Sequence, residues 1–187
     1  MPVNKKSRVL ELLPIISNIK NKKLKDGVLD VWVRAWEDSD WKDLTDCPFS
    51  VNLKVKLEEC SLVQHTTCVT NIALAMADNV RDILGIPVNN DLVLAGALLH
   101  DVCKVVENAP GDKHSTIGKN LAHGVYGVHL AINAGLPIEI AHIIGSHTPQ
   151  VTQVPNIVEG ILVSYADMAA VDPILLKKGA PLFYKRH

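Results

Sequence analysis

Aromatic residues are scarce in this chain of 187 residues: they make up 4% of it, whereas hydrophobic residues as a whole reach 48%. The chain can therefore bury a sizeable core, but that core must be aliphatic and built from Leu, Ile, Val and Ala. The length suits one domain with a short extension and is too small for two ordinary domains.

The sequence also lacks a charge excess and long apolar runs. Its 19 basic and 20 acidic residues give a net charge of −1, which argues against binding a nucleic acid polymer or a membrane surface through bulk positive charge. No apolar run approaches the ~18 residues that span a bilayer. Glu11 and Pro14 interrupt the apolar N-terminal stretch and no small-residue cleavage site follows, so we expect no secretory signal.

Closely paired cysteines are missing as well. The chain has four cysteines, and none of them forms a C-x-x-C motif: Cys47, Cys60, Cys68 and Cys103. This spacing favours reduced thiols over a disulfide framework or a zinc knuckle, and it predicts a cytoplasmic protein.

The hydrophobic pattern that is present has a helical period. Leu62, His65, Val69, Ile72 and Met76 follow one another at steps of three and four, which places them on one helix face. No segment alternates convincingly as a strand does, so the predicted fold class is all-α. The expected helices of the regular part cover residues 53–84, 91–107, 119–134, 137–146 and 156–171.

The N-terminal part has a different character. Residues 1–52 are predicted to form an extension that packs on the core, and residues 53–187 to form the main domain. All three tryptophans lie in the extension: Trp32, Trp36 and Trp41. We interpret them as a small separate cluster that docks the extension; a lid over a functional site is the alternative.

Four ionisable residues stand where the pattern demands a core. His65 lies on the apolar helix face, His100 and Asp101 follow the apolar run LVLAGALL, and Asp167 lies within ILVSYADMAAV. Each alone could be a hydrogen-bonded core residue or a salt-bridge partner. Together they are hard to explain that way, because buried unpaired carboxylates cost several kcal/mol. A metal ion would stabilise carboxylates and neutral imidazoles together.

The order His65, His100-Asp101 and Asp167, with LLHDVCK around the pair, resembles the HD-domain superfamily of metal-dependent phosphohydrolases. The resemblance covers about residues 60–172. It implies a helical bundle whose metal is held by these four residues.

Binuclear members of the superfamily have two further histidines between the pair and the last aspartate. His123 in HGVYG and His147 in IIGSHT match those places. The resemblance then implies two divalent transition-metal ions (Fe, Mn, Co, Ni or Zn) bridged by Asp101. His129 and His142 should point to other helix faces and are not expected to be ligands.

Basic residues near the pair suggest an anionic substrate. Lys104 is four residues from His100, which on a helix would place it on the same face and let it neutralise a phosphate oxygen. A solvated lysine at a helix end is the alternative. Lys113, His114 and Lys119 in the polar loop GDKHSTIGK are candidate substrate contacts, although an ordinary loop explains them equally well.

These features predict an enzyme that cleaves a phosphoester or phosphoanhydride, with a nucleotide as the expected substrate. A metal-bound hydroxide would attack phosphorus, Asp101 would orient it, and Lys104 would stabilise developing charge. The stretch HGVYGVHLA…IIGSHT…YAD is similar to a bacterial family that splits dinucleoside tetraphosphates symmetrically. Two alternatives stay open: a di-iron oxygenase acting on a small hydroxylated or phosphonate substrate, and a nucleotide-sensing module. No particular oligomeric state is indicated.

Overall fold

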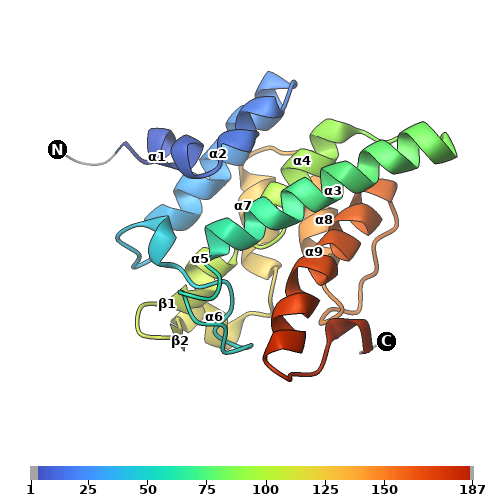
Figure 1. Cartoon of the computed structure of the whole chain (residues 1–187). Helices are drawn as coiled ribbons and strands as arrows, with labels where there is room; N and C mark the ends of the chain where they lie inside the picture. Colours follow the sequence, from blue (N-terminus) through green and yellow to red (C-terminus); the bar gives the residue numbers. More distant parts are fainter. Residues whose placement is uncertain (1–3, 186–187) are drawn as a thin grey trace.

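Helices form most of the structure between residues 4 and 185, the part of the chain that this computed structural model describes (Figure 1). The α-helices are α1 (Lys5–Leu12), α2 (Lys22–Glu37), α3 (Leu62–Leu84), α4 (Asn90–Leu99), α5 (Lys104–Glu107), α6 (Thr116–Asn120), α7 (Val125–Asn133), α8 (Ile138–Ser146) and α9 (Val158–Lys177). Short 3₁₀ helices cover Pro14–Asn18 (η1), Leu44–Asp46 (η2) and Phe183–Lys185 (η3). Strands β1 (Asn108–Ala109) and β2 (Lys113–His114) form one small antiparallel pair. The predicted all-α class is confirmed.

The long helix α3 begins later than its apolar pattern predicted. Ser61 caps it: the Ser61 hydroxyl accepts from the backbone N–H of Gln64 at 3.2 Å, and the Gln64 side chain accepts from the N–H of Ser61 at 2.8 Å. This capping box satisfies two amides that have no partner within the helix. Residues 53–60 form turns instead, so the expected helical start at residue 53 was wrong.

Two other expected helices are interrupted. The helix expected over 91–107 ends at Leu99, turns through residues 100–103, and resumes as α5. Its N-cap is Asn89, whose side chain accepts from two backbone amides of the first turn. The helix expected over 119–134 is split into α6 and α7, and Gly124 between them has a φ of 87°, which favours glycine.

The last long helix runs further than expected. Helix α9 continues past residue 171 to Lys177 with Pro173 inside it, although proline normally ends a helix because it lacks an N–H. Helix α8, in contrast, matches the expected range 137–146 closely. No helix within residues 4–185 is both long enough and apolar enough to cross a membrane.

The core is mostly aliphatic and lies between α3, α4, α8, α9 and the N-terminal helices. Helix α3 packs against α4 and α9, and α8 packs against α4 and α7. Figure 1 shows α3 running across one face of the molecule, with α9 beside it. This packing brings together three parts of the chain that carry the candidate site residues: the first turn of α3, the C-terminal end of α4 and the middle of α9.

The N-terminal helices cover one side of this core, where α2 contacts α4 and α7. The Trp32 indole N–H donates to the carbonyl of Leu98 at 3.1 Å, and the Trp41 indole N–H donates to the carbonyl of Val105 at 3.0 Å. All three tryptophans belong to the main core, so the expectation of a separate cluster was wrong. Two of them bind the backbone on either side of His100 and Asp101.

Candidate metal centre and active site

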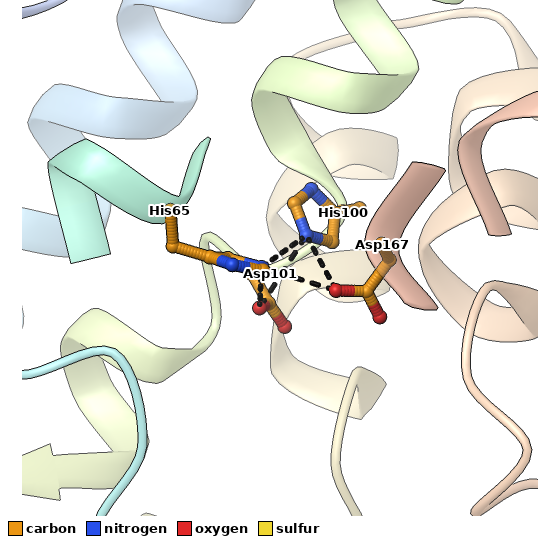
Figure 2. A group of neighbouring side chains, drawn as sticks. All are labelled: His65, His100, Asp101 and Asp167. Atoms are coloured by element: carbon orange, nitrogen blue, oxygen red, sulfur yellow. Dashed lines mark hydrogen bonds and ion pairs between the residues drawn. The ribbon is translucent and has the colours of Figure 1, made fainter. Parts of the chain in front are cut away.

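Four buried side chains converge from three parts of the chain (Figure 2). His65 comes from α3, His100 and Asp101 from the turn after α4, and Asp167 from α9. The Nε2 atom of His65 lies 3.1 Å from Nε2 of His100 and 3.1 Å from Oδ1 of Asp167. The structure thus brings together the set that the sequence singled out.

A second group adjoins the first. His123, in the turn before α7, places its Nε2 3.4 Å from Nε2 of His147, which follows α8. These two nitrogens lie 3.1 Å and 3.6 Å from Oδ1 of Asp101. The other oxygen of the same carboxylate, Oδ2, lies 3.2 Å from His65. Asp101 therefore presents one oxygen to each group.

Three of the imidazoles are oriented from outside the site. Nδ1 of His100 lies 2.7 Å from the carbonyl of Ala97, and Nδ1 of His147 lies 2.9 Å from the carbonyl of Ile144. Nδ1 of His123 lies 2.9 Å from a carboxylate oxygen of Glu107. An acceptor at Nδ1 keeps the proton there, so the Nε2 lone pair points inward, as histidine ligands of metals do.

The chemistry of this donor set fits divalent metal ions. Oδ1 of Asp101 and Oδ1 of Asp167 are buried and accept no hydrogen bond from residues 4–185. In the first group, two imidazole nitrogens face each other at 3.1 Å, an arrangement in which two lone pairs repel unless a proton or a cation lies between them. Imidazole and carboxylate ligands together suit transition metals better than Mg²⁺.

Lys104 adds a cation beside the shared carboxylate. Its Nζ lies 2.6 Å from Oδ2 of Asp101 and 4.0 Å from the centre of the Phe49 ring. Burial alone would raise the pKa of Asp101, but Lys104 and His100 outweigh it and hold that pKa well below its usual range. Burial alone would lower the pKa of Lys104, yet Asp101 and Asp167 raise it. Both groups are charged at neutral pH.

The geometric reason for the position of Lys104 differs from the predicted one. We expected one continuous helix to carry it on the same face as His100, but the helix breaks between them. Lys104 opens α5 and reaches Asp101, three residues earlier, across the turn. The turn of residues 100–103, and not a shared helix face, therefore places Lys104 beside the pair His100 and Asp101.

A cleft connects the site to the surface. Asp101, Lys104 and Asp167 line it together with the segment 49–53. Several polar side chains of the lining can donate and accept hydrogen bonds: Asn52, Asn108, His114, Thr148 and Gln150. These side chains offer contacts for a polar group attached to the reacting centre.

The other candidate residues lie at different places. His114 lines the cleft, and its Nε2 is 2.7 Å from Oδ1 of Asn52. Lys113 and Lys119 are exposed and do not line the cleft. His129 pairs with Asn133 on the surface, and His142 accepts from the backbone of Asn156. Neither of these last two histidines belongs to a metal-binding group.

Glu107 is one of the residues near the site that were not predicted from the sequence. It is 8% exposed and contacts His123. An acid directly after the apolar pair Val105 and Val106 was a readable signal of burial. It went unnoticed because it stood at the end of the helix expected over 91–107, next to a polar loop.

The match to known proteins agrees with this geometry. Residues 62–172 match the family model of the HD domain, so the chain belongs to the HD-domain superfamily of metal-dependent phosphohydrolases, whose domains bind divalent metals.

A dihydroneopterin 2′,3′-cyclic phosphate phosphodiesterase from Methanocaldococcus jannaschii is similar to the chain, with 33% identity over 162 residues. The aligned part covers 83% of this chain and 60% of that relative, so the chain spans about three fifths of the relative's length. No solved structure matches the chain.

Proposed function

We propose that this protein is a metal-dependent phosphohydrolase that cleaves a phosphoester or phosphoanhydride, with a nucleotide or a nucleotide-derived compound as its substrate. The observation that carries the proposal is the division of the Asp101 carboxylate between two groups of imidazoles, with Oδ1 3.1 Å from His123 and Oδ2 3.2 Å from His65. Such a shared carboxylate suits two cations placed side by side.

The proposed ligands of one ion are His65, His100, Asp101 and Asp167, and those of the other are Asp101, His123 and His147. Fe, Mn, Co, Ni and Zn all suit these donors. Two divalent ions would outweigh two carboxylates and leave the site positive, which favours a phosphate group. When bound, such ions activate water and neutralise phosphate oxygens.

The protein's own residues would perform three tasks. His100, His123 and His147 keep their Nε2 lone pairs turned inward through their Nδ1 partners, so these three imidazoles are oriented before substrate arrives. Lys104 keeps its proton and can bind a phosphate oxygen as charge develops. The segment 49–53 lines the cleft and can contact the substrate there.

The comparison supports hydrolysis of a phosphodiester. The named relative is a phosphodiesterase of dihydroneopterin 2′,3′-cyclic phosphate, as its name states. The polar wall of the cleft, with Asn52, Asn108 and Gln150, suits a sugar or a heterocycle attached to such a phosphate.

The proposed location is the cytoplasm. The four cysteines are free thiols, which supports this location.

A substrate screen tests the proposal. Metal-free protein would be reloaded anaerobically with Fe(II) or Mn(II) and offered 2′,3′-cyclic nucleotides, linear diesters, nucleoside phosphates and dinucleoside tetraphosphates. We expect metal-dependent cleavage of at least one of these classes, with no oxygen consumed. Oxygen uptake with a hydroxylated or phosphonate substrate, and no cleavage of any phosphate compound, would contradict the proposal.

A further inference from the structure

Glu107 is a buried carboxylate beside the site but outside the proposed ligand set. Its Oε2 lies 2.9 Å from Nδ1 of His123, and its Oε1 accepts from the backbone N–H of Gly124 at 3.3 Å. Both oxygens are thus engaged with the turn that carries His123. Because a buried charge needs hydrogen-bond partners, and both partners of this carboxylate belong to that turn, Glu107 binds the turn specifically.

His123 needs such a partner because of where it lies. His100 and His147 each follow a helix, and their Nδ1 atoms bind the carbonyl oxygen three residues earlier in that helix. His123 lies in the turn between α6 and α7 and has no preceding helical turn of this kind. The Glu107 carboxylate lies at Nδ1 of His123, as a helix carbonyl does at Nδ1 of His100 and of His147.

The backbone of Glu107 is itself fixed. Its carbonyl accepts from the N–H of Ser115 at 2.9 Å, and the next residue pairs with His114 in the small sheet. Gly118 in α6 packs so tightly on this carbonyl that any side chain there would collide with it. The hairpin and α6 therefore hold the carboxylate at a set distance from His123.

We propose that Glu107 is a positioning residue: by accepting the Nδ1 proton of His123, it fixes the tautomer that presents Nε2 to the ion held with His147 and Asp101. The inference rests on the proposed function, which places an ion there. A negatively charged acceptor also makes the imidazole a stronger ligand than a backbone carbonyl does. Cys103, Glu107 and His123 also lie close enough together to hold an ion, but the proposal assigns Glu107 to the Nδ1 proton of His123, because its two oxygens bind His123 and Gly124.

The variant Glu107→Gln tests this role because it keeps the length of the side chain and removes the charge. Metal-free protein would be titrated with Co(II), with calorimetry for affinity and visible absorption for the geometry of each ion. We expect the first ion to bind as in the wild type and the second about 10–100-fold more weakly, with an altered spectrum for that ion. Two ions bound with wild-type affinities and spectra would overturn the proposal.

A control variant separates this effect from loss of a carboxylate bond to the backbone. Glu159 also accepts from a backbone N–H, that of Asn89 at 2.8 Å, but it belongs to none of the groups that could hold a metal ion. Glu159→Gln should bind both ions as the wild type does. If Glu107→Gln lowered only the melting temperature of the metal-free protein and left Co(II) binding unchanged, Glu107 would be structural and the proposal would be wrong.

A measurement on the wild type avoids any folding defect of the variant. In the zinc-loaded protein, ¹⁵N chemical shifts should show a proton on Nδ1 of His123 and none on Nε2. A proton on Nε2, or zinc bound through Nδ1, would overturn the role of Glu107. The two proposals fail in different ways. A wild type that binds one ion contradicts the two-ion proposal. The tautomer of His123 decides the role of Glu107, whatever the number of ions.

Discussion

Lys104 holds its ammonium 2.6 Å from Oδ2 of Asp101 while resting on the face of the Phe49 ring. The aromatic ring and the carboxylate fix the position of a long, flexible side chain in a place that is 15% exposed. A preorganised cation of this kind stabilises charge in a transition state more than a mobile one does, because it needs no reorganisation during the reaction.

Replacing Lys104 should therefore affect turnover more than metal binding. We expect Lys104→Met to lower kcat by about 10²–10³-fold and to keep the wild-type metal content. Steady-state kinetics and metal analysis of the same preparation check this. Lys22→Met, which removes an exposed lysine paired with Asp26, should change neither quantity; a Lys104→Met enzyme with unchanged kcat would contradict the role.

Removing a histidine of the second group should change the number of ions. We expect His123→Ala to lower bound metal from two equivalents toward one, because His123 faces only Oδ1 of the shared carboxylate. His129→Ala, which removes a surface histidine bound to Asn133, should leave the metal content unchanged. Elemental analysis of protein purified without oxygen measures both; an unchanged content in His123→Ala would show that His123 is not a ligand.

The residues that the structure brings together were easier to predict from the sequence than their surroundings. Ionisable residues inside apolar runs, such as Asp167 in ILVSYADMAAV, must be buried, and buried charges need a common partner; this reasoning holds whatever the helix boundaries are. The break after Leu99 was invisible because the apolar residues continue on both sides of it. The segment 49–53 and Glu107 were missed because their proximity to the site depends on tertiary packing, which no local pattern records.

The tryptophans of the N-terminal segment should stabilise the turn that carries the proposed ligands His100 and Asp101. Trp32→Phe removes the donor to the carbonyl of Leu98 and leaves that buried carbonyl without this bond. We expect the free energy of unfolding to fall by about 1–3 kcal/mol. Denaturant unfolding of the metal-free protein measures the change, and a difference below about 0.5 kcal/mol would show that the bond contributes little.

Acid should weaken the attachment of the N-terminal helix. Arg8 donates from Nε to Oδ2 of Asp43 at 2.9 Å and lowers the pKa of that carboxyl to about 2. A carboxyl with a lowered folded-state pKa stabilises the fold above its unfolded pKa, which is about 3.9. This contribution is lost as the pH falls from about 4 toward 2.

Comparison of variants isolates this contribution. The difference in unfolding free energy between the wild type and Asp43→Asn should be largest above pH 5. It should shrink as the pH falls from about 4 toward 2. Asp40→Asn, a change at an exposed aspartate, serves as the control. A difference that stays constant between pH 5 and pH 2.5 would be inconsistent with the Arg8–Asp43 pair.

A two-ion hydrolase is tested most directly by a metal titration of metal-free protein with phosphate-ester cleavage as its readout, run in parallel on Asp101→Asn. We expect activity to rise to a maximum at two equivalents of Fe(II) or Mn(II), and Asp101→Asn to bind little metal and to stay inactive, because Asp101 presents an oxygen to both groups. Full activity at one equivalent, or cleavage that persists in the presence of a chelator, would contradict the account.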